Sequence, residues 1–216
     1  MNTIKICGLT RAKDARTAAD LGADFLGLVF HRPSLRFVSP DDAARLTSAV
    51  PARWIGVFVD APSDEILRIA GATGLHGAQL HGDEPPAMVD RLRRAGLLVI
   101  RAHRIAGADD LKAMNGFDAD ADLLDTFDPG RRGGTGRTFD WRFAADAART
   151  RRVLLAGGLD AENVGDAIRT VRPWGVDVSS GVESGPGHKD PEKMSRFIDA
   201  ARAAFAVTQG GSHGKR

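Results

Sequence analysis

The stretch Arg152-Val153-Leu154-Leu155-Ala156, followed by Gly157-Gly158 and by a helical pattern over Ala161–Val171, shows the unit that decides the fold. The strand lacks the alternation of a half-buried strand, which is typical of a parallel strand covered by helices. The two glycines allow a tight turn between the strand and the helix. This stretch therefore predicts one strand–turn–helix unit of a parallel α/β protein.

The same unit recurs along the whole chain. Strands are predicted over 3–7, 24–30, 54–59, 77–81, 97–102, 122–126, 152–156 and 175–179, and helices over 11–21, 40–49, 63–72, 84–95, 108–115, 139–148, 161–171 and 191–206. Eight units in 216 residues leave about 27 residues for each, close to the minimum for a strand, a helix and two turns. The sequence favours one (βα)8 TIM barrel over 1–207. An open doubly wound sheet is the rival architecture, because it shows the same alternation.

Local signals refine the boundaries of these elements. Thr10 and Ser63 are predicted to cap the helices that follow them, and Pro40 and Pro191 suit first helical turns. The polar, glycine-rich segment 208–216 is predicted to be a disordered tail.

Composition excludes several classes of protein. With 43% apolar and 27% charged residues, the chain can bury a core and is not intrinsically disordered. Its 30 basic and 28 acidic residues are interspersed, which argues against nucleic-acid and membrane-surface binding. The sequence contains no apolar run long enough to span a membrane, and its first residues do not predict a secretory signal, so a cytoplasmic location is expected. A single cysteine and scattered histidines predict neither a disulfide nor a metal site.

Two residues at predicted strand ends are candidates for proton transfer. Cys7 ends the first strand, and the bowl of a parallel barrel lies at this end of its strands. A thiolate there is a competent base, although a lone cysteine is more often a small buried hydrophobe. Lys5, two residues earlier, has the spacing to share the face of Cys7. Asp125 follows two leucines, where desolvation would raise its pKa and keep it protonated as an acid; the alternative is a structural carboxylate.

Anion binding is predicted at three turns. Gly157-Gly158 and Ser180-Gly181 follow the seventh and eighth strands, the usual phosphate site of such barrels, although each pair alone could simply be a tight turn. Arg36, after the second strand, is a candidate clamp for a carboxylate or else a solvated arginine.

Two further segments each allow more than one interpretation. His81 lies at the end of the fourth strand and is a candidate substrate contact or a histidine bonded to loop backbone. The segment Gly133–Gly136 follows Arg131 and Arg132 but lacks the third glycine of a dinucleotide fingerprint, so a mobile lid is the better prediction.

Nine motifs in order resemble the phosphoribosylanthranilate isomerase family of tryptophan biosynthesis. They are Lys5–Gly8, Gly27–Phe30, Ser34–Arg36, Gly56–Phe58, Gln79–Gly82, Leu124–Thr126, Gly133–Gly136, Leu155–Leu159 and Asp177–Glu183. Each motif is loose, but the ordered set is highly specific and covers residues 4 to about 190. One departure is Leu35, where the family commonly has proline; it concerns loop stiffness, since the arginine is retained.

The resemblance implies a (βα)8 barrel without a cofactor. It implies an Amadori rearrangement of N-(5-phosphoribosyl)anthranilate to 1-(2-carboxyphenylamino)-1-deoxyribulose 5-phosphate, with Asp125 as general acid and Cys7 as general base. Arg36 matches the residue that binds the anthranilate carboxylate. The phosphate cradle matches Gly157, Gly158, Ser180 and Gly181.

The expected partner is a small anionic phosphosugar, and the protein is expected to be a monomer or a homodimer. Two alternatives are another phosphosugar-isomerising barrel and a non-catalytic phosphosugar-binding regulator. The first generally uses a carboxylate where Cys7 stands, and intact Cys7 and Asp125 argue against the second.

Overall fold

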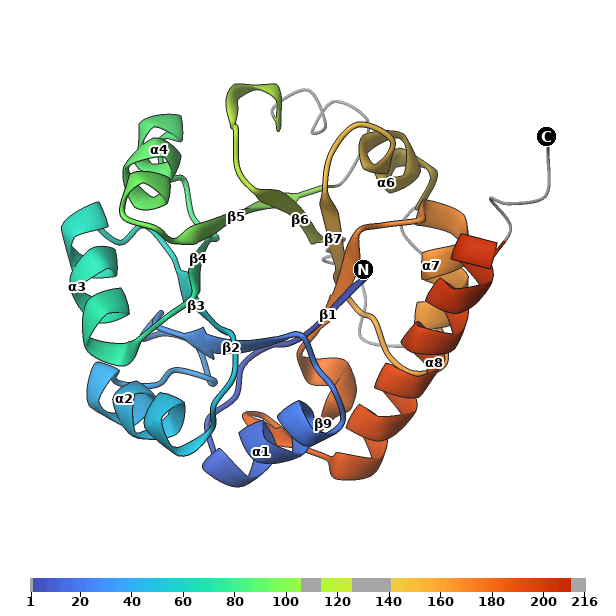
Figure 1. The fold of residues 1–216 in the computed structure, drawn as a ribbon, viewed down its shortest axis with the longest axis horizontal. Coiled ribbons are helices and arrows are strands. Elements are labelled where there is room, and N and C mark those ends of the chain that lie inside the picture. Colours follow the sequence, from blue (N-terminus) through green and yellow to red (C-terminus); the bar gives the residue numbers. More distant parts are fainter. Residues whose placement is uncertain (1, 106–113, 126–140, 211–216) are drawn as a thin grey trace.

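The computed structural model describes residues 2–105, 114–125 and 141–210 and contains a closed barrel of eight parallel strands. The strands are β1 (Thr3–Ile6), β2 (Phe25–Val29), β3 (Trp54–Phe58), β4 (Gly77–Leu80), β5 (Leu98–Arg104), β6 (Ala121–Asp125), β7 (Val153–Ala156) and β8 (Gly175–Val178). They form the central ring of Figure 1 in chain order. Pairing of β8 with β1, from Thr3↔Gly175 to Ile6↔Val178, closes the ring. The predicted barrel is therefore confirmed, and the open sheet is excluded.

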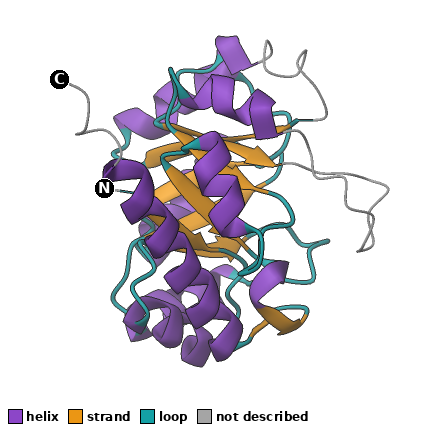
Figure 2. Ribbon diagram, turned by 90° about the vertical axis from the view of Figure 1, so that its right-hand side faces the viewer, coloured by secondary structure: helices purple, strands orange, loops and turns teal. Residues whose placement is uncertain are grey.

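Helices surround the barrel, as Figure 2 shows. They are α1 (Ala12–Asp20), α2 (Pro40–Ala49), α3 (Ser63–Thr73), α4 (Pro86–Arg94), α6 (Trp141–Ala148), α7 (Val164–Val171) and α8 (Pro191–Gly210). Of the predicted fifth helix, 108–115, residues 106–113 lie outside the described part, and a short 3-10 helix, η1, covers Met114–Gly116. A 3-10 helix, η2 (Ser180–Val182), and a small hairpin of β9 (Glu183–Gly185) and β10 (His188–Lys189) follow β8. The sequence analysis did not predict this hairpin.

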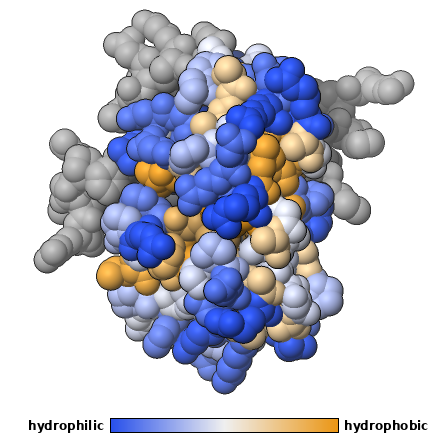
Figure 3. Space-filling model, turned by 90° about the vertical axis from the view of Figure 1, so that its left-hand side faces the viewer, coloured by the Kyte–Doolittle hydropathy of each residue, from blue (hydrophilic) through white to orange (hydrophobic). Residues whose placement is uncertain are grey.

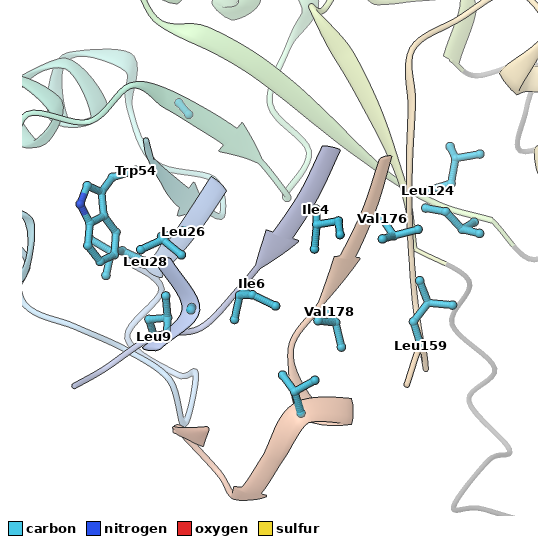
Figure 4. Packing of buried hydrophobic residues seen from close by; sticks show 14 of the residues in the cluster. Ile4, Ile6, Leu9, Leu26, Leu28, Trp54, Leu124, Leu159, Val176 and Val178 are labelled. Carbon is cyan, nitrogen blue, oxygen red and sulfur yellow. The ribbon is translucent and has the colours of Figure 1, made fainter. Parts of the chain in front are cut away.

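Two hydrophobic clusters hold the layers together. The larger one joins alternate strand residues to the helices, and Figure 4 shows its members Ile4 and Ile6 of β1 and Val176 and Val178 of β8. The residues between them point to the other side of each strand. The smaller cluster accordingly contains Phe25, Ile55, Ile100, Ala102, Ala121, Leu123, Leu154 and Ala156. These side chains fill the barrel interior, which makes it a packed core rather than a pore.

Two predicted helix caps are wrong, because other groups bind the hydroxyls. Thr10 Oγ1 donates to the Gly187 carbonyl at 2.6 Å, and Arg11 occupies the cap position of α1 without a side-chain bond. Ser63 is already helical, and its Oγ accepts from Arg91 Nη1 at 2.7 Å. Sequence reasoning missed two caps. The Ser39 hydroxyl accepts from the Asp42 amide at 3.1 Å before α2, and Asp190 Oδ1 accepts from the Glu192 and Lys193 amides at 2.9 and 3.1 Å before α8.

The last helix is longer than predicted. It continues through Gly210, so residues 208–210 of the predicted tail are helical, and Thr208 Oγ1 donates to the Phe205 carbonyl. Residues 211–216 lie outside the described part. In Figure 3, hydrophilic residues cover most of the face in view.

Candidate active site

A cavity of about 450 Å³ lies at the carboxyl end of the barrel. Its lining draws at least one residue from each of the eight strands or from the turn that follows, including Cys7, Val29, Val57, Gln79, Arg104, Asp125, Ala156 and Asp177. All the predicted site residues lie in this lining: Cys7, Arg36, His81, Asp125, Gly157, Gly158, Ser180 and Gly181. The barrel topology brings them together from positions up to 174 residues apart.

Cys7 is the most enclosed of the candidate reactive groups. Its residue is 7% exposed, and its amide donates to the Val178 carbonyl at 2.8 Å. A side chain at Gly27 would place a Cβ only 2.8 Å from Cys7 Sγ, so glycine is required on the neighbouring strand. Burial raises the pKa of the Cys7 thiol, and the Lys5 ammonium acts in the opposite direction through its charge and a side-chain hydrogen bond. The thiolate therefore depends on this lysine.

Lys5 is held inside the barrel by Asp177. The Lys5 ammonium, fully buried, lies 2.8 Å from Asp177 Oδ1. Burial alone would lower the pKa of Lys5, but Asp177 and Cys7 outweigh it and raise the pKa above the ordinary value. Lys5 thus remains a cation next to the sulfur. The spacing of Lys5 and Cys7 allowed a shared face, but the ion pair of Lys5 with Asp177 joins residues 172 positions apart and has no local sequence signal.

Asp125, at the end of β6, is less enclosed than predicted. Its side chain is 28% exposed to solvent at the cavity, because it emerges at the strand end beyond the apolar run. His81 Nε2 lies 3.7 Å from Asp125 Oδ2, and His81 Nδ1 lies 2.9 Å from Gln79 Nε2. His81 is thus oriented by a side chain of its own strand, rather than by loop backbone.

Two turns between these groups carry the predicted phosphate cradle. Gly157 and Gly158 have φ angles of 85° and 63°, which favour glycine, after β7. A Cβ at Gly181 would lie 1.9 Å from the Leu159 carbonyl oxygen, so only glycine allows the turn after β8 to approach the turn after β7. The approach places backbone of both turns on one wall of the cavity.

Arg36 reaches the cavity from the loop after β2. Its Nε and Nη2 donate to Glu183 Oε1 and Oε2 at 2.8 and 2.6 Å. The Arg36 amide donates to Ser34 Oγ, while Cδ lies so close to Gly8 that a Cβ there would be 2.5 Å away. Arg36 is therefore a fixed group rather than a solvated loop arginine. Sequence analysis missed Glu183, its partner.

Other features bear on the function less directly. The predicted lid, Gly133–Gly136 with Arg131 and Arg132, lies outside the described residues. Among the residues that the structure describes, no cluster of three or more His, Cys, Asp or Glu side chains is arranged to hold a metal ion. Within the same ranges, no helix combines the length and apolar content that crossing a bilayer requires.

Comparison with known proteins places this chain in a family. The model of the family "PRAI: N-(5'phosphoribosyl)anthranilate (PRA) isomerase" matches residues 4–200. N-(5'-phosphoribosyl)anthranilate isomerase from Pelobacter propionicus is 46% identical over 204 residues, which cover 94% of this chain and 96% of that protein. The corresponding protein from Citrifermentans bemidjiense is 45% identical over 204 residues, covering 94% of this chain and 98% of the relative.

Solved structures agree. The crystal structure of phosphoribosyl anthranilate isomerase from Thermotoga maritima is 41% identical, with a TM-score of 0.86 over 94% of this chain and 100% of the other. A structure of the isomerase in complex with reduced 1-(o-carboxyphenylamino)-1-deoxyribulose 5-phosphate is 38% identical, with a TM-score of 0.83 and the same coverage. The chain therefore belongs to the N-(5'-phosphoribosyl)anthranilate isomerase family.

Proposed function

We propose that this chain catalyses the Amadori rearrangement of N-(5-phosphoribosyl)anthranilate to 1-(2-carboxyphenylamino)-1-deoxyribulose 5-phosphate in tryptophan biosynthesis. Membership of the isomerase family supports the reaction. The assignment of residues rests on one observation: Cys7, directly after β1, and Asp125, at the end of β6, line one cavity, and their strands are three places apart around the ring. The reaction needs an acid and a base at different atoms of one small substrate, and this separation suits that need.

Asp125 is the general acid. It donates its proton to the furanose ring oxygen, the bond from that oxygen to C1 breaks, and the nitrogen lone pair forms the protonated Schiff base. The partly exposed position of Asp125 supports this role, because water at the cavity mouth can return a proton to the carboxylate. His81, 3.7 Å away, is a substrate contact beside the acid.

Cys7 is the general base. Its thiolate removes the proton from C2 of the open-chain sugar, and the electron pair moves into the C1–C2 bond and neutralises the iminium nitrogen. The resulting enolamine tautomerises to the ketone. The Lys5 ammonium supports this role, because it favours the thiolate of a buried cysteine.

Binding groups hold the two ends of the substrate. The guanidinium of Arg36 binds the anthranilate carboxylate, and backbone groups of Gly157, Gly158, Ser180 and Gly181 bind the phosphate. An arginine presents five N–H donors, so an arginine bound by Glu183 at Nε and Nη2 retains donors for a second carboxylate. The substrate is a dianionic phosphosugar with a further carboxylate, and both charges meet matching groups.

The test is the loss of the anthranilate fluorescence of the substrate when it is mixed with purified protein. We expect catalytic loss of fluorescence with many turnovers per protein molecule, unaffected by a chelator. Stoichiometric binding without turnover would support a non-catalytic phosphosugar-binding protein and contradict the proposal. A loss of activity with the chelator would contradict the metal-free mechanism.

Location and assembly follow from the same proposal. A cytoplasmic location is in keeping with a biosynthetic enzyme. The protein is a monomer or a homodimer; a relative from Thermotoga maritima is described as a dimeric isomerase from which monomers were generated.

A further inference from the structure

A buried group of charges lies behind Arg36, outside the lining of the cavity. Glu183, at the start of β9, has a side chain 5% exposed and binds Arg36 on one side. Glu183 Oε1, which accepts from Arg36 Nε, also lies 2.8 Å from the fully buried ammonium of Lys189, on β10. Neither Glu183 nor Lys189 lines the cavity, whereas Arg36 does. The carboxylate thus holds the guanidinium from behind.

The hairpin that carries these residues is fixed at several points. Lys189 Nζ donates to the Ser179 carbonyl at 3.0 Å, next to the phosphate turn, and the Lys189 amide donates to Asp14 Oδ2 at 3.1 Å. Lys193 Nζ donates to the backbone carbonyl of Glu183 at 2.8 Å. The hairpin therefore connects Glu183, which binds the guanidinium of Arg36, to the turn after β8.

The geometry of the pair leaves one side of the guanidinium for a ligand. Glu183 uses Nε and one N–H of Nη2, and the fork of Nη1 and the second N–H of Nη2 matches the geometry of another carboxylate. A pair of one arginine and one glutamate carries no net charge and would attract an anion weakly. Lys189 adds a positive charge, so the group of three has a net charge of +1.

We propose that Glu183, held by Lys189, is a positioning residue that fixes Arg36 for the carboxylate of the substrate. A fixed guanidinium loses less side-chain freedom on binding than a mobile one, and that difference appears as affinity for the carboxylate. The inference rests on the proposed role of Arg36. In this inference Glu183 affects the selectivity for the substrate and the KM. Neither Glu183 nor Lys189 takes part in proton transfer.

The experiment compares two competitive inhibitors. One is reduced 1-(o-carboxyphenylamino)-1-deoxyribulose 5-phosphate, and the other is the phenylamino analogue that lacks the carboxylate. The ratio of their inhibition constants measures how strongly the site selects the carboxylate. The phosphate is common to both, so a general loss of structure changes both constants together.

Three variants separate the effect of positioning Arg36 from the effect of the net charge of the group. Glu183→Gln should reduce the selectivity for the carboxylate about tenfold, the scale of one charged hydrogen bond, with KM raised about tenfold and kcat within about twofold of wild type. Lys189→Met should give a smaller loss of the same kind. The double variant Glu183→Gln/Lys189→Met keeps the net charge at +1 and avoids an unpaired buried lysine, so it should fold even if Glu183→Gln does not, and it should lose the same selectivity.

Glu192→Gln is the matched control. It makes the same change from carboxylate to amide at an exposed glutamate in the first turn of α8, and its selectivity should equal that of wild type. Unchanged selectivity in folded Glu183→Gln or in the double variant, or an equal loss for both inhibitors, would overturn the inference. Arg36→Ala separates the proposed role of Arg36 from the inferred role of Glu183. If Arg36→Ala keeps the selectivity for the carboxylate, the proposed role of Arg36 is wrong and this inference is wrong with it. If Arg36→Ala loses the selectivity and the Glu183 variants keep it, only the role of Glu183 is contradicted.

Discussion

The two sides of the cavity hold their charged groups differently. On the side of β1, β2 and β8, Lys5 lies 2.8 Å from Asp177, and Arg36 makes two bonds to Glu183; Lys5, Asp177 and Glu183 are buried. On the side of β4 and β6, the contact between His81 and Asp125 is 3.7 Å long, and their side chains are 23% and 28% exposed. Among these groups, tight ion pairs thus hold the rigid side of the cavity, and the looser side has one longer, partly exposed contact.

The difference suits the charge that each group must carry in the proposed mechanism. As the proposed base, Cys7 reacts as an anion, and burial penalises the anion, so a fixed cation must be supplied nearby. As the proposed acid, Asp125 reacts in the neutral form and must recover its proton afterwards. Exposure to water serves that recovery, and a tight ion pair would hinder it.

The largest expected effects come from removing the two reactive groups. Cys7→Ala and Asp125→Asn should each lower kcat by about 10² to 10⁴-fold, the usual contribution of a positioned acid or base, while the substrate still binds. Steady-state kinetics together with titration of bound substrate measure both quantities. Loss of binding with normal turnover of the bound fraction would show that these residues are anchors instead.

A substitution in the turn after β8, which carries the proposed phosphate-binding residue Gly181, tests the rigid side of the cavity. Gly181→Ala should raise KM by about 10²-fold, or about 2.7 kcal/mol of binding, because the new Cβ would collide with the Leu159 carbonyl and separate the two turns. Gly185→Ala is the control, since no atom lies within 4 Å of its Cβ position. Equal KM values for the two variants would contradict the close approach of the turns.

The pH dependence tests the pairing of Lys5 with Cys7. The base must be deprotonated, and burial raises its pKa, so kcat/KM should rise with pH over the alkaline range in the wild type. Removing the cation in Lys5→Met raises the pKa further and should move this rise upward by about one pH unit, about tenfold in rate at neutral pH. Lys5→Met/Asp177→Asn should move it less, because Asp177 also raises the pKa of Cys7. An identical profile in all three proteins would remove Lys5 from the account.

The smallest effect is expected on the looser side of the cavity. His81→Asn should lower kcat/KM less than about fivefold, since a partly exposed pair at this distance contributes less than about 1 kcal/mol. Gln79→Leu, which removes the side-chain partner of His81 Nδ1, should have no larger effect. A loss comparable to that of Asp125→Asn would show that the histidine takes part in proton transfer.

Most of the fold could be predicted from the sequence, because apolar runs and glycine turns are local signals. Both ends of α2 are as predicted, as are the starts of β1, β3, β4, β8, α3 and α8 and the ends of β7, α6 and α7; the remaining ends of the described strands and helices differ by a few residues. The cap predictions for Thr10 and Ser63 failed because tertiary partners, Gly187 and Arg91, bind the hydroxyls. No local rule could have indicated them.

The candidate site also combines predictable and unpredictable parts. Positions at strand ends predicted that Cys7, Asp125 and the glycine turns share one rim, where the structure has them, since parallel strands deliver their ends to one rim. The ion pairs that hold the site could not be predicted, because Lys5 pairs with Asp177 across 172 positions and Arg36 with Glu183 across 147. Such pairings exist only once the ring is closed.

The most direct test of the central claim follows the hydrogen at C2 of the sugar. Substrate deuterated at C2 is incubated with wild type and with Cys7→Ala, at concentrations that give equal amounts of bound substrate. Mass spectrometry then measures how much deuterium remains at C2 of the recovered substrate, in its cyclic and open-chain forms. The account predicts that the wild type removes the deuterium at the rate of turnover, whereas Cys7→Ala binds the substrate and leaves the deuterium in place. Removal of the deuterium by Cys7→Ala at the wild-type rate would contradict the assignment of Cys7 as the base.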